Sequence, residues 1–157
     1  MSFRFVHRGG VVAALATLAL AAFVPLAGAD SVFHTLHAEL VPVGNAPLRS
    51  GFVNDIHTNG NVNYAHEVYQ LNGASPNTTY QVSIRLYLFD PTCSTLPVLI
   101  PTTTLTTNGA GNGKAGFTFL AGSIPPPLVG SPHGIAWQLT TGSTVAYQTG
   151  CNVLTLD

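Results

Sequence analysis

Apolar and polar residues alternate with a period of two along much of this chain. In residues 79–89, every second side chain from Tyr80 to Leu88 is large and apolar, and those between them are polar as far as Arg85. Because successive side chains of a strand point to opposite faces, this pattern predicts a half-buried strand of an antiparallel sheet. Asp90 and Pro91 then end the strand.

Seven further segments have strand character, and Gly and Pro recur too often between them for long helices. One is marked by Phe52 and Ile56, and another places Ile135, Trp137 and Leu139 on one inner face. About eight short strands separated by turns predict an all-β fold, a single antiparallel β-sandwich. The seven segments are 32–40, 52–56, 61–71, 96–107, 115–120, 135–139 and 145–156.

The segment 96–107 contains Pro97 and Pro101, which cannot donate to a β ladder, so we expect an edge strand there. The residues that follow, 108–113, are Asn, Gly and Ala, and most of them tolerate the positive φ of a tight turn. We therefore expect this turn to join 96–107 to 115–120 as a β-hairpin.

The first 29 residues have the layout of a secretory signal peptide, with a basic start, an apolar run over 11–26 and small residues at 27–29. Cleavage before Asp30 would leave 30–157 as one secreted β-sandwich domain. The alternative is an uncleaved membrane anchor, because a run of this length could just span a bilayer. Pro25 near the end of the run favours cleavage. We expect a secreted or cell-envelope location, the periplasm included, with no membrane contact afterwards.

Charged residues make up only 7% of the chain, and the formal net charge is −1. Nucleic-acid binding depends on clustered Lys and Arg, so this composition argues against it. The two cysteines, Cys93 and Cys151, form an even pair in a chain that we expect to reach an oxidising compartment. We predict a disulfide between them, worth roughly 4 kcal/mol on the chain-entropy model. Metal binding by two thiolates is the alternative.

Residues 71–82, with the sequence Leu-Asn-Gly-Ala-Ser-Pro-Asn-Thr-Thr-Tyr-Gln-Val, resemble the corner of fibronectin type III and related immunoglobulin-like domains. The resemblance implies an immunoglobulin-like sandwich with a structural corner formed by Leu71, Pro76, Tyr80 and Val82. It also implies that the Tyr80 ring lies in the core and that its hydroxyl bonds to backbone nearby. More β sequence follows Tyr80 than a type III module contains.

Three histidines, His57, His66 and His133, are candidates for a zinc or copper site, together with Asp55 or Glu67. The alternative is that they are scattered surface or loop residues. No other cofactor is indicated. The alternation predicts that Glu67, like Glu39, faces outward as a solvated carboxylate.

Tyr87 and Phe89 fall on the polar side of segment 79–89. Exposed aromatic rings on a sheet can stack on sugar rings or form part of a protein contact. The alternative is that a loop or a neighbouring strand covers them.

A coherent catalytic set is missing from the sequence: there is no Gly-x-Ser-x-Gly elbow, and the two cysteines are expected to be oxidised. The sequence therefore favours a secreted, non-enzymatic β-sandwich module that binds an extracellular protein or glycan or forms a structural part of the cell exterior. Two alternatives stay open. One is a metal-binding protein or metal-dependent enzyme built on the three histidines, and the other is a carbohydrate-binding module that uses Tyr87 and Phe89.

Overall fold

The structure is a computed structural model that describes residues 33–58, 65–120, 126–128 and 130–155. The predicted signal peptide, 1–29, lies outside the described residues. In the described part, no helix is long and apolar enough to cross a membrane.

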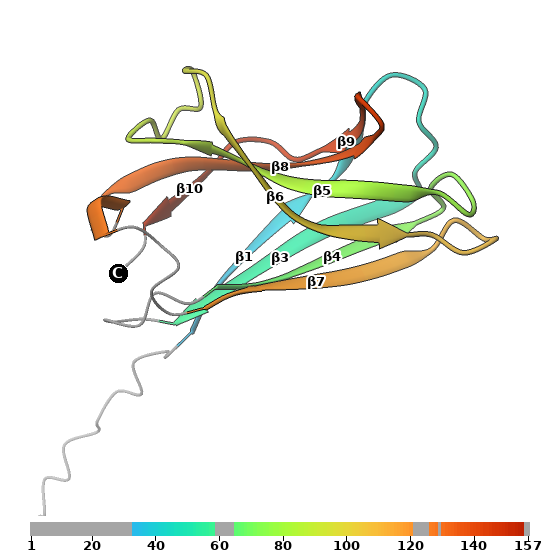
Figure 1. The fold of residues 1–157 in the computed structure, drawn as a ribbon, viewed down its shortest axis with the longest axis horizontal. Helices are drawn as coiled ribbons and strands as arrows, with labels where there is room; N and C mark the ends of the chain where they lie inside the picture. Colours follow the sequence, from blue (N-terminus) through green and yellow to red (C-terminus); the bar gives the residue numbers. More distant parts are fainter. Residues whose placement is uncertain (1–32, 59–64, 121–125, 129, 156–157) are drawn as a thin grey trace, which may run out of the picture.

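Two antiparallel sheets are stacked face to face, which confirms the predicted all-β sandwich (Figure 1). One sheet has four strands in the order β1-β3-β4-β7. Its strands are β1 (Phe33–Glu39), β3 (Ser50–Thr58), β4 (Ala65–Asn72) and β7 (Gly113–Phe119).

The second sheet has six strands, of which five follow the order β2-β9-β8-β5-β6. The sixth, β10, pairs with the first half of β8, while β9 pairs with the second half. Its strands are β2 (Val41–Pro42), β5 (Thr79–Tyr87), β6 (Val98–Thr106), β8 (Pro132–Thr141), β9 (Thr144–Gln148) and β10 (Asn152–Thr155); a 3-10 turn, η1 (Pro126–Leu128), precedes β8.

The core lies between the sheets and is built from the alternate residues that the pattern of β5 and β8 indicated. Tyr80, Val82 and Ile84 of β5 are buried, as are Trp137 and Leu139 of β8. Burying these apolar side chains removes them from water, which is the main favourable contribution to folding. The predicted strand 79–89 ends two residues early, at Tyr87.

The prediction of a hairpin between 96–107 and 115–120 is wrong, because β6 and β7 lie in different sheets and β7 pairs with β4. The turn packs against the β4–β5 turn instead of closing on its own strands. Ala74 N donates to Gly111 O at 3.0 Å, and Gly73 N donates to Asn112 Oδ1 at 3.1 Å. At Gly111 (φ 75°), an added Cβ would lie 2.1 Å from Ala74 O, so only glycine fits this close approach.

The inner face of β3 is not the one that its large apolar residues suggest. Phe52 and Ile56 face outward, and the buried residues of this strand are Gly51, Val53, Asp55 and His57. The same register places Glu67 of β4 opposite Asp55, so Glu67 also points into the core. The expectation of a solvated Glu67 is therefore wrong.

The corner residues Leu71, Tyr80 and Val82 are buried, and Pro76 is exposed in the turn before β5. The Tyr80 hydroxyl does not follow the implied geometry. It lies 3.4 Å from the Tyr147 hydroxyl, which itself donates to a backbone carbonyl, that of Pro47, at 2.8 Å. The corner thus bonds to β9 instead of to backbone nearby.

Candidate functional site

A network of polar side chains lies in the middle of the core. Glu67 accepts hydrogen bonds from two donors: the indole Nε1 of Trp137 at 2.9 Å, and the hydroxyl of Tyr69. Glu67 and Tyr69 come from β4 and Trp137 comes from β8, so the network joins the two sheets. Each of these side chains is buried.

Thr102 extends the network to a third strand. It lies within an irregularity where β6 shifts register against β5, between the pairs Gln81–Thr104 and Ser83–Pro101. A bulge of this kind changes the direction in which a side chain points. The Thr102 hydroxyl lies 3.0 Å from the Tyr69 hydroxyl.

Asp55 is the second buried acid, and it pairs directly with Glu67 across β3 and β4. Both are only 1% exposed, and Asp55 Oδ1 has no hydrogen-bond partner in the described part of the chain. Burial raises the pKa of Asp55 from 3.8 to about 6. Burial also raises the pKa of Glu67, to about 8, and the charge of Asp55 adds to that rise. The hydrogen bonds from Tyr69 and Trp137 act in the opposite direction.

Raised carboxyl pKa values are common in active sites, but they also occur in structural networks. Here the solvent exposure of the two acids distinguishes these cases. Asp55 and Glu67 lie between two closed sheets, and the side chains around Glu67 are fully buried. Among the described residues these groups are closed off from water, and the hydrogen bond from Trp137 to Glu67 links the two sheets.

The three candidate metal ligands do not come together. His57 faces the core from β3, whereas His66 faces outward from β4, with its Nδ1 2.8 Å from the Thr118 hydroxyl. His133 is buried on β8: its Nδ1 accepts from Phe89 N at 3.0 Å, and its Nε2 donates to Leu128 O at 2.9 Å. The described residues contain no group of three or more His, Cys, Asp or Glu side chains that could hold a metal ion. Of the two alternatives, a metal site or separate histidines, the described residues show separate histidines.

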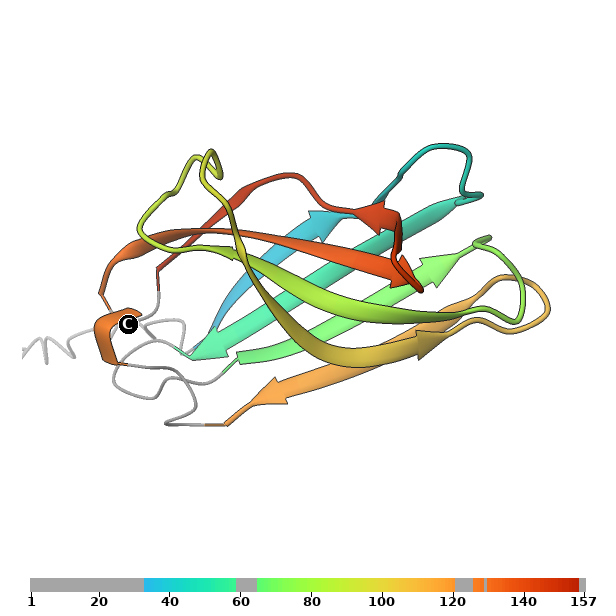
Figure 2. The same cartoon turned by 45° about the horizontal axis from the view of Figure 1, so that its top comes forward.

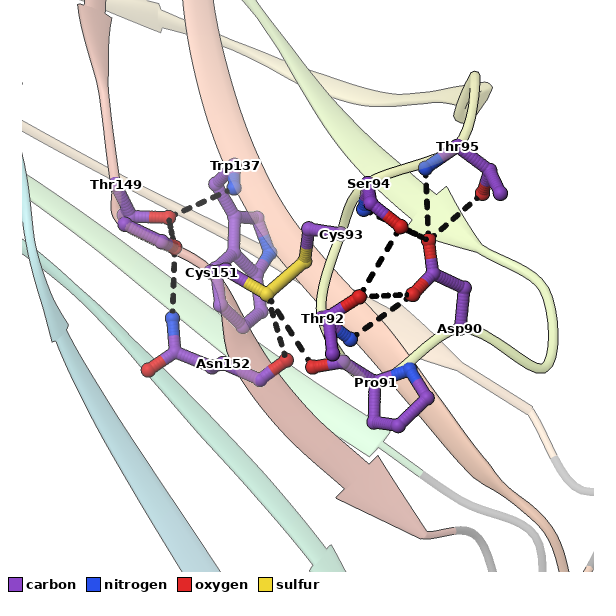
Figure 3. The surroundings of a disulfide bond; sticks show 11 residues. Asp90, Pro91, Thr92, Cys93, Ser94, Thr95, Trp137, Thr149, Cys151 and Asn152 are labelled. Carbon is purple, nitrogen blue, oxygen red and sulfur yellow. Dashed lines mark hydrogen bonds between the residues drawn. A yellow bond between two sulfur atoms is a disulfide. The ribbon is translucent and has the colours of Figure 1, made fainter.

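The disulfide between Cys93 and Cys151 is present, as predicted. It joins the connection between β5 and β6, residues 88–97, to the break between β9 and β10 (Figure 3). At the start of this break, Thr149 is fixed to β8, because its hydroxyl accepts from Trp137 N at 3.0 Å. The disulfide therefore holds the connection against the sheet.

Asp90 organises the same connection. Its two carboxylate oxygens accept six hydrogen bonds, from the backbone N–H and the hydroxyl of Thr92, Ser94 and Thr95 (Figure 3). These bonds, first those from Thr92 and Thr95, hold the pKa of Asp90 well below its ordinary value. Residues 88–97, which we name the braced loop, are thus fixed by one covalent link and one fully bonded carboxylate.

The braced loop projects from the six-stranded sheet in both views (Figures 1 and 2). It carries large apolar side chains that remain in water: Phe89 is 61% exposed and Leu96 is 94% exposed. Three neighbouring residues are also exposed, Leu88 in the loop and Val98 and Leu99 at the start of β6. We name these five residues the loop surface.

Of the two alternatives for Tyr87, an exposed aromatic ring or a covered one, the structure shows the covered one. Tyr87 is only 3% exposed. Its pairing partner on β8 is Gly134, against which Asp90 and Cys93 of the braced loop pack. The guanidinium of Arg85 lies 5.6 Å from the centre of the Tyr87 ring. Phe89 is exposed as expected, with its ring 5.1 Å from that of His133.

Sequence reasoning missed the core network. One signal for the network was present. Glu67 shares the period-two positions of β4 with Ala65, Tyr69 and Leu71, so a carboxylate interrupts an apolar face. Comparison with protein-family models, with curated proteins and with solved structures finds no match to this chain.

Proposed function

We propose that this chain is an exported, non-enzymatic β-sandwich module that binds a protein partner through the loop surface. The observation that carries the proposal is the braced loop itself: it displays large apolar side chains on a segment whose conformation is already fixed. Rigid presentation lowers the entropy lost on binding, and apolar anchors supply most of the energy of a protein interface.

The chemistry of the loop surface favours an apolar, uncharged protein surface as the occupant. Within residues 88–97 the only side chain with a titratable charge is that of Asp90, and its carboxylate is fully occupied by its own loop. A glycan would need exposed rings and polar groups, and Tyr87 does not contribute one. The metal-dependent alternative loses its support because the three histidines lie apart.

Export is supported by the three-part pattern of residues 1–29 and by the disulfide, since disulfides persist in oxidising compartments. We infer a secreted or cell-envelope location from these two features together.

The strand order supports an immunoglobulin-like class for the sandwich. The strands β3-β4-β7 and β9-β8-β5 follow the order of strands A, B, E and G, F, C of an immunoglobulin domain, with β6 beside β5 in the place of C′. Two features depart from that class: β1 adds a strand outside β3, and the tyrosine corner precedes the strand that corresponds to C.

Site-specific photo-cross-linking in the cells that make the protein tests the proposed interface. A cross-linker at Leu96 should capture one defined protein, and a cross-linker at Lys114, an exposed position on the other sheet, should not. With the cross-linker at Leu96, capture should be lost when Val98→Ser is added and retained when Val41→Ser is added. Val41 is a matched control, because Val98 and Val41 are 47% and 48% exposed. Equal capture from both cross-linker positions, or none from Leu96, would contradict the proposal. Capture of a second copy would make the chain its own partner.

A further inference from the structure

A pocket lies on another part of the molecule, where the chain leaves the four-stranded sheet. The last pair between β1 and β3 joins Glu39 to Phe52, and the chain then crosses to the other sheet, where Val41 pairs with Gln148. The beginning of β3 therefore pairs with β4 on one side and lacks a paired strand on the β1 side. A pocket of about 320 Å³ forms there, within the usual size range of small-ligand sites. We name it the crossover pocket.

The walls of the crossover pocket are held by the core. The segment that returns from β2 to β3 is fixed at Val43, whose N–H donates to Ala146 O at 2.8 Å, and at Pro47, whose carbonyl accepts from Tyr147. Arg49 N donates to Asn72 O at 2.9 Å. The pocket is thus formed before any ligand arrives, and binding costs little reorganisation.

Two opposite charges line the pocket without a partner. Glu39 and Arg49 are both exposed, and in the described part of the chain neither side chain makes a hydrogen bond or an ion pair. Arg49 offers a planar set of donors that fits a carboxylate, and Glu39 offers acceptors only. A ligand that satisfies both must carry an anionic group and separate hydrogen-bond donors.

The remaining lining residues add a hydroxyl and an apolar wall. The Ser50 hydroxyl accepts from Asn72 Nδ2 at 3.1 Å, so its own proton can be donated to a ligand. Phe52 lies half-buried at the pocket, with its ring 5.1 Å from that of His37. An aromatic ring beside charged hydrogen-bonding groups suits a ring that has one apolar face and several hydroxyls.

We propose that the crossover pocket binds an acidic sugar, a hexuronic acid residue of a glycan. Its carboxylate would pair with Arg49, its ring hydroxyls would donate to Glu39, and its C–H face would lie on Phe52. A neutral sugar leaves Arg49 unpaired, and a free α-amino acid has no ring to cover Phe52. This site is separate from the loop surface, so the two proposals can fail independently.

Calorimetric titration of the purified protein with a galacturonate trimer tests the proposal. We expect binding, and at least about tenfold weaker binding in Arg49→Gln, because a charge-assisted pair is lost. Arg85→Gln is the matched control, since Arg85 lies over Tyr87 on the other sheet, and it should bind like the unmodified protein. Glu39→Gln and Phe52→Leu should each weaken binding several-fold. Circular dichroism verifies that each variant is folded.

Three results would overturn the proposal. The first is no binding of the galacturonate trimer. The second is binding of a galactose trimer as tight as that of the acidic trimer, because the carboxylate would then play no part. The third is Arg49-dependent binding of free alanine with no binding of the trimer, which would indicate an amino-acid site.

Discussion

The indole of Trp137 on β8 donates a 2.9 Å hydrogen bond to Glu67 on β4, a residue 70 positions earlier in the sequence. This bond crosses the centre of the sandwich. It links two sheets that otherwise meet mainly through apolar contacts, and it supplies a buried carboxyl with one of its two donors. A buried polar network with satisfied partners favours one arrangement of the sheets over others.

Replacing Trp137 with Phe tests this link. Glu67 Oε1 would lose its donor inside the core, and a smaller ring would leave a void. We expect a loss of about 2 kcal/mol or more in the free energy of unfolding, measured by urea denaturation followed by circular dichroism. Ile135→Val, a smaller deletion on the inner face of the same strand, should cost about 1 kcal/mol.

A void alone would not change the titration of Glu67. Because the indole hydrogen bond lowers the pKa of Glu67, its loss should raise that pKa further in Trp137→Phe and leave it unchanged in Ile135→Val. An unchanged Glu67 titration in both variants would contradict a specific hydrogen bond.

The acid pair makes stability depend on pH. The folded-state pKa values of Asp55 and Glu67 are raised, to about 6 and about 8, so the folded state retains protons that the unfolded chain releases. Stability should therefore be greatest at low pH and should fall as the pH rises towards 8. Asp55→Asn lacks one of the two titrating acids. As the pH rises from 5 to 8, its free energy of unfolding should therefore fall by about 1 to 2 kcal/mol less than that of the unmodified protein.

Equilibrium urea unfolding at several pH values measures this difference. Glu39→Gln, which replaces an exposed carboxylate, provides the control. A plot of its free energy of unfolding against pH should run parallel to that of the unmodified protein. If the plot for Asp55→Asn is also parallel to that of the unmodified protein, Asp55 and Glu67 do not form a buried pair.

Gly134 allows the braced loop to lie on β8. A Cβ added at Gly134 would lie 2.4 Å from Asp90 O and 2.7 Å from Cys93 Sγ, so Gly134→Ala must displace the loop. We expect a loss of about 2 to 3 kcal/mol in the free energy of unfolding and increased exposure of Tyr87. Gly150→Ala, next to the same disulfide, has no atom within 4 Å of the added Cβ and should change stability by less than about 0.5 kcal/mol. Similar effects from both substitutions would argue against close packing of the loop.

The tyrosine pair predicts an order of effects. Tyr147→Phe removes the bond to Pro47 O and the acceptor of Tyr80, whereas Tyr80→Phe removes only the long 3.4 Å contact. Tyr80→Phe should cost about 1 kcal/mol, and Tyr147→Phe should cost about 1 kcal/mol more. Urea unfolding followed by the fluorescence of Trp137, the single tryptophan of the chain, measures both. The reverse order would show that Tyr147 does not hold the segment before β3.

Sequence reasoning predicted the features that depend on local pattern. The strand at β5, the inner positions of Trp137 and Leu139, and the disulfide were predicted and are present. Each follows from periodicity or from a count of cysteines, so no knowledge of distant contacts was needed.

The errors occurred where contacts with residues distant in the sequence decide whether a side chain is buried or exposed. Phe52 marks β3 by its hydrophobicity, yet the inner face of β3 carries Asp55, and the strand register places Glu67 beside it on the same face. Glu67 is stable in the core only because Trp137 and Tyr69 donate to it. A period-two pattern contains none of this information.

Burial of the acidic groups in the core leaves binding to the outer surface of the sandwich. The most direct test is a pH titration of the Glu67 side-chain carboxyl carbon by NMR in the folded protein. The predicted midpoint is about 8. A midpoint near the ordinary value of 4.5 would show that Glu67 is in contact with water, and would contradict a closed acidic core.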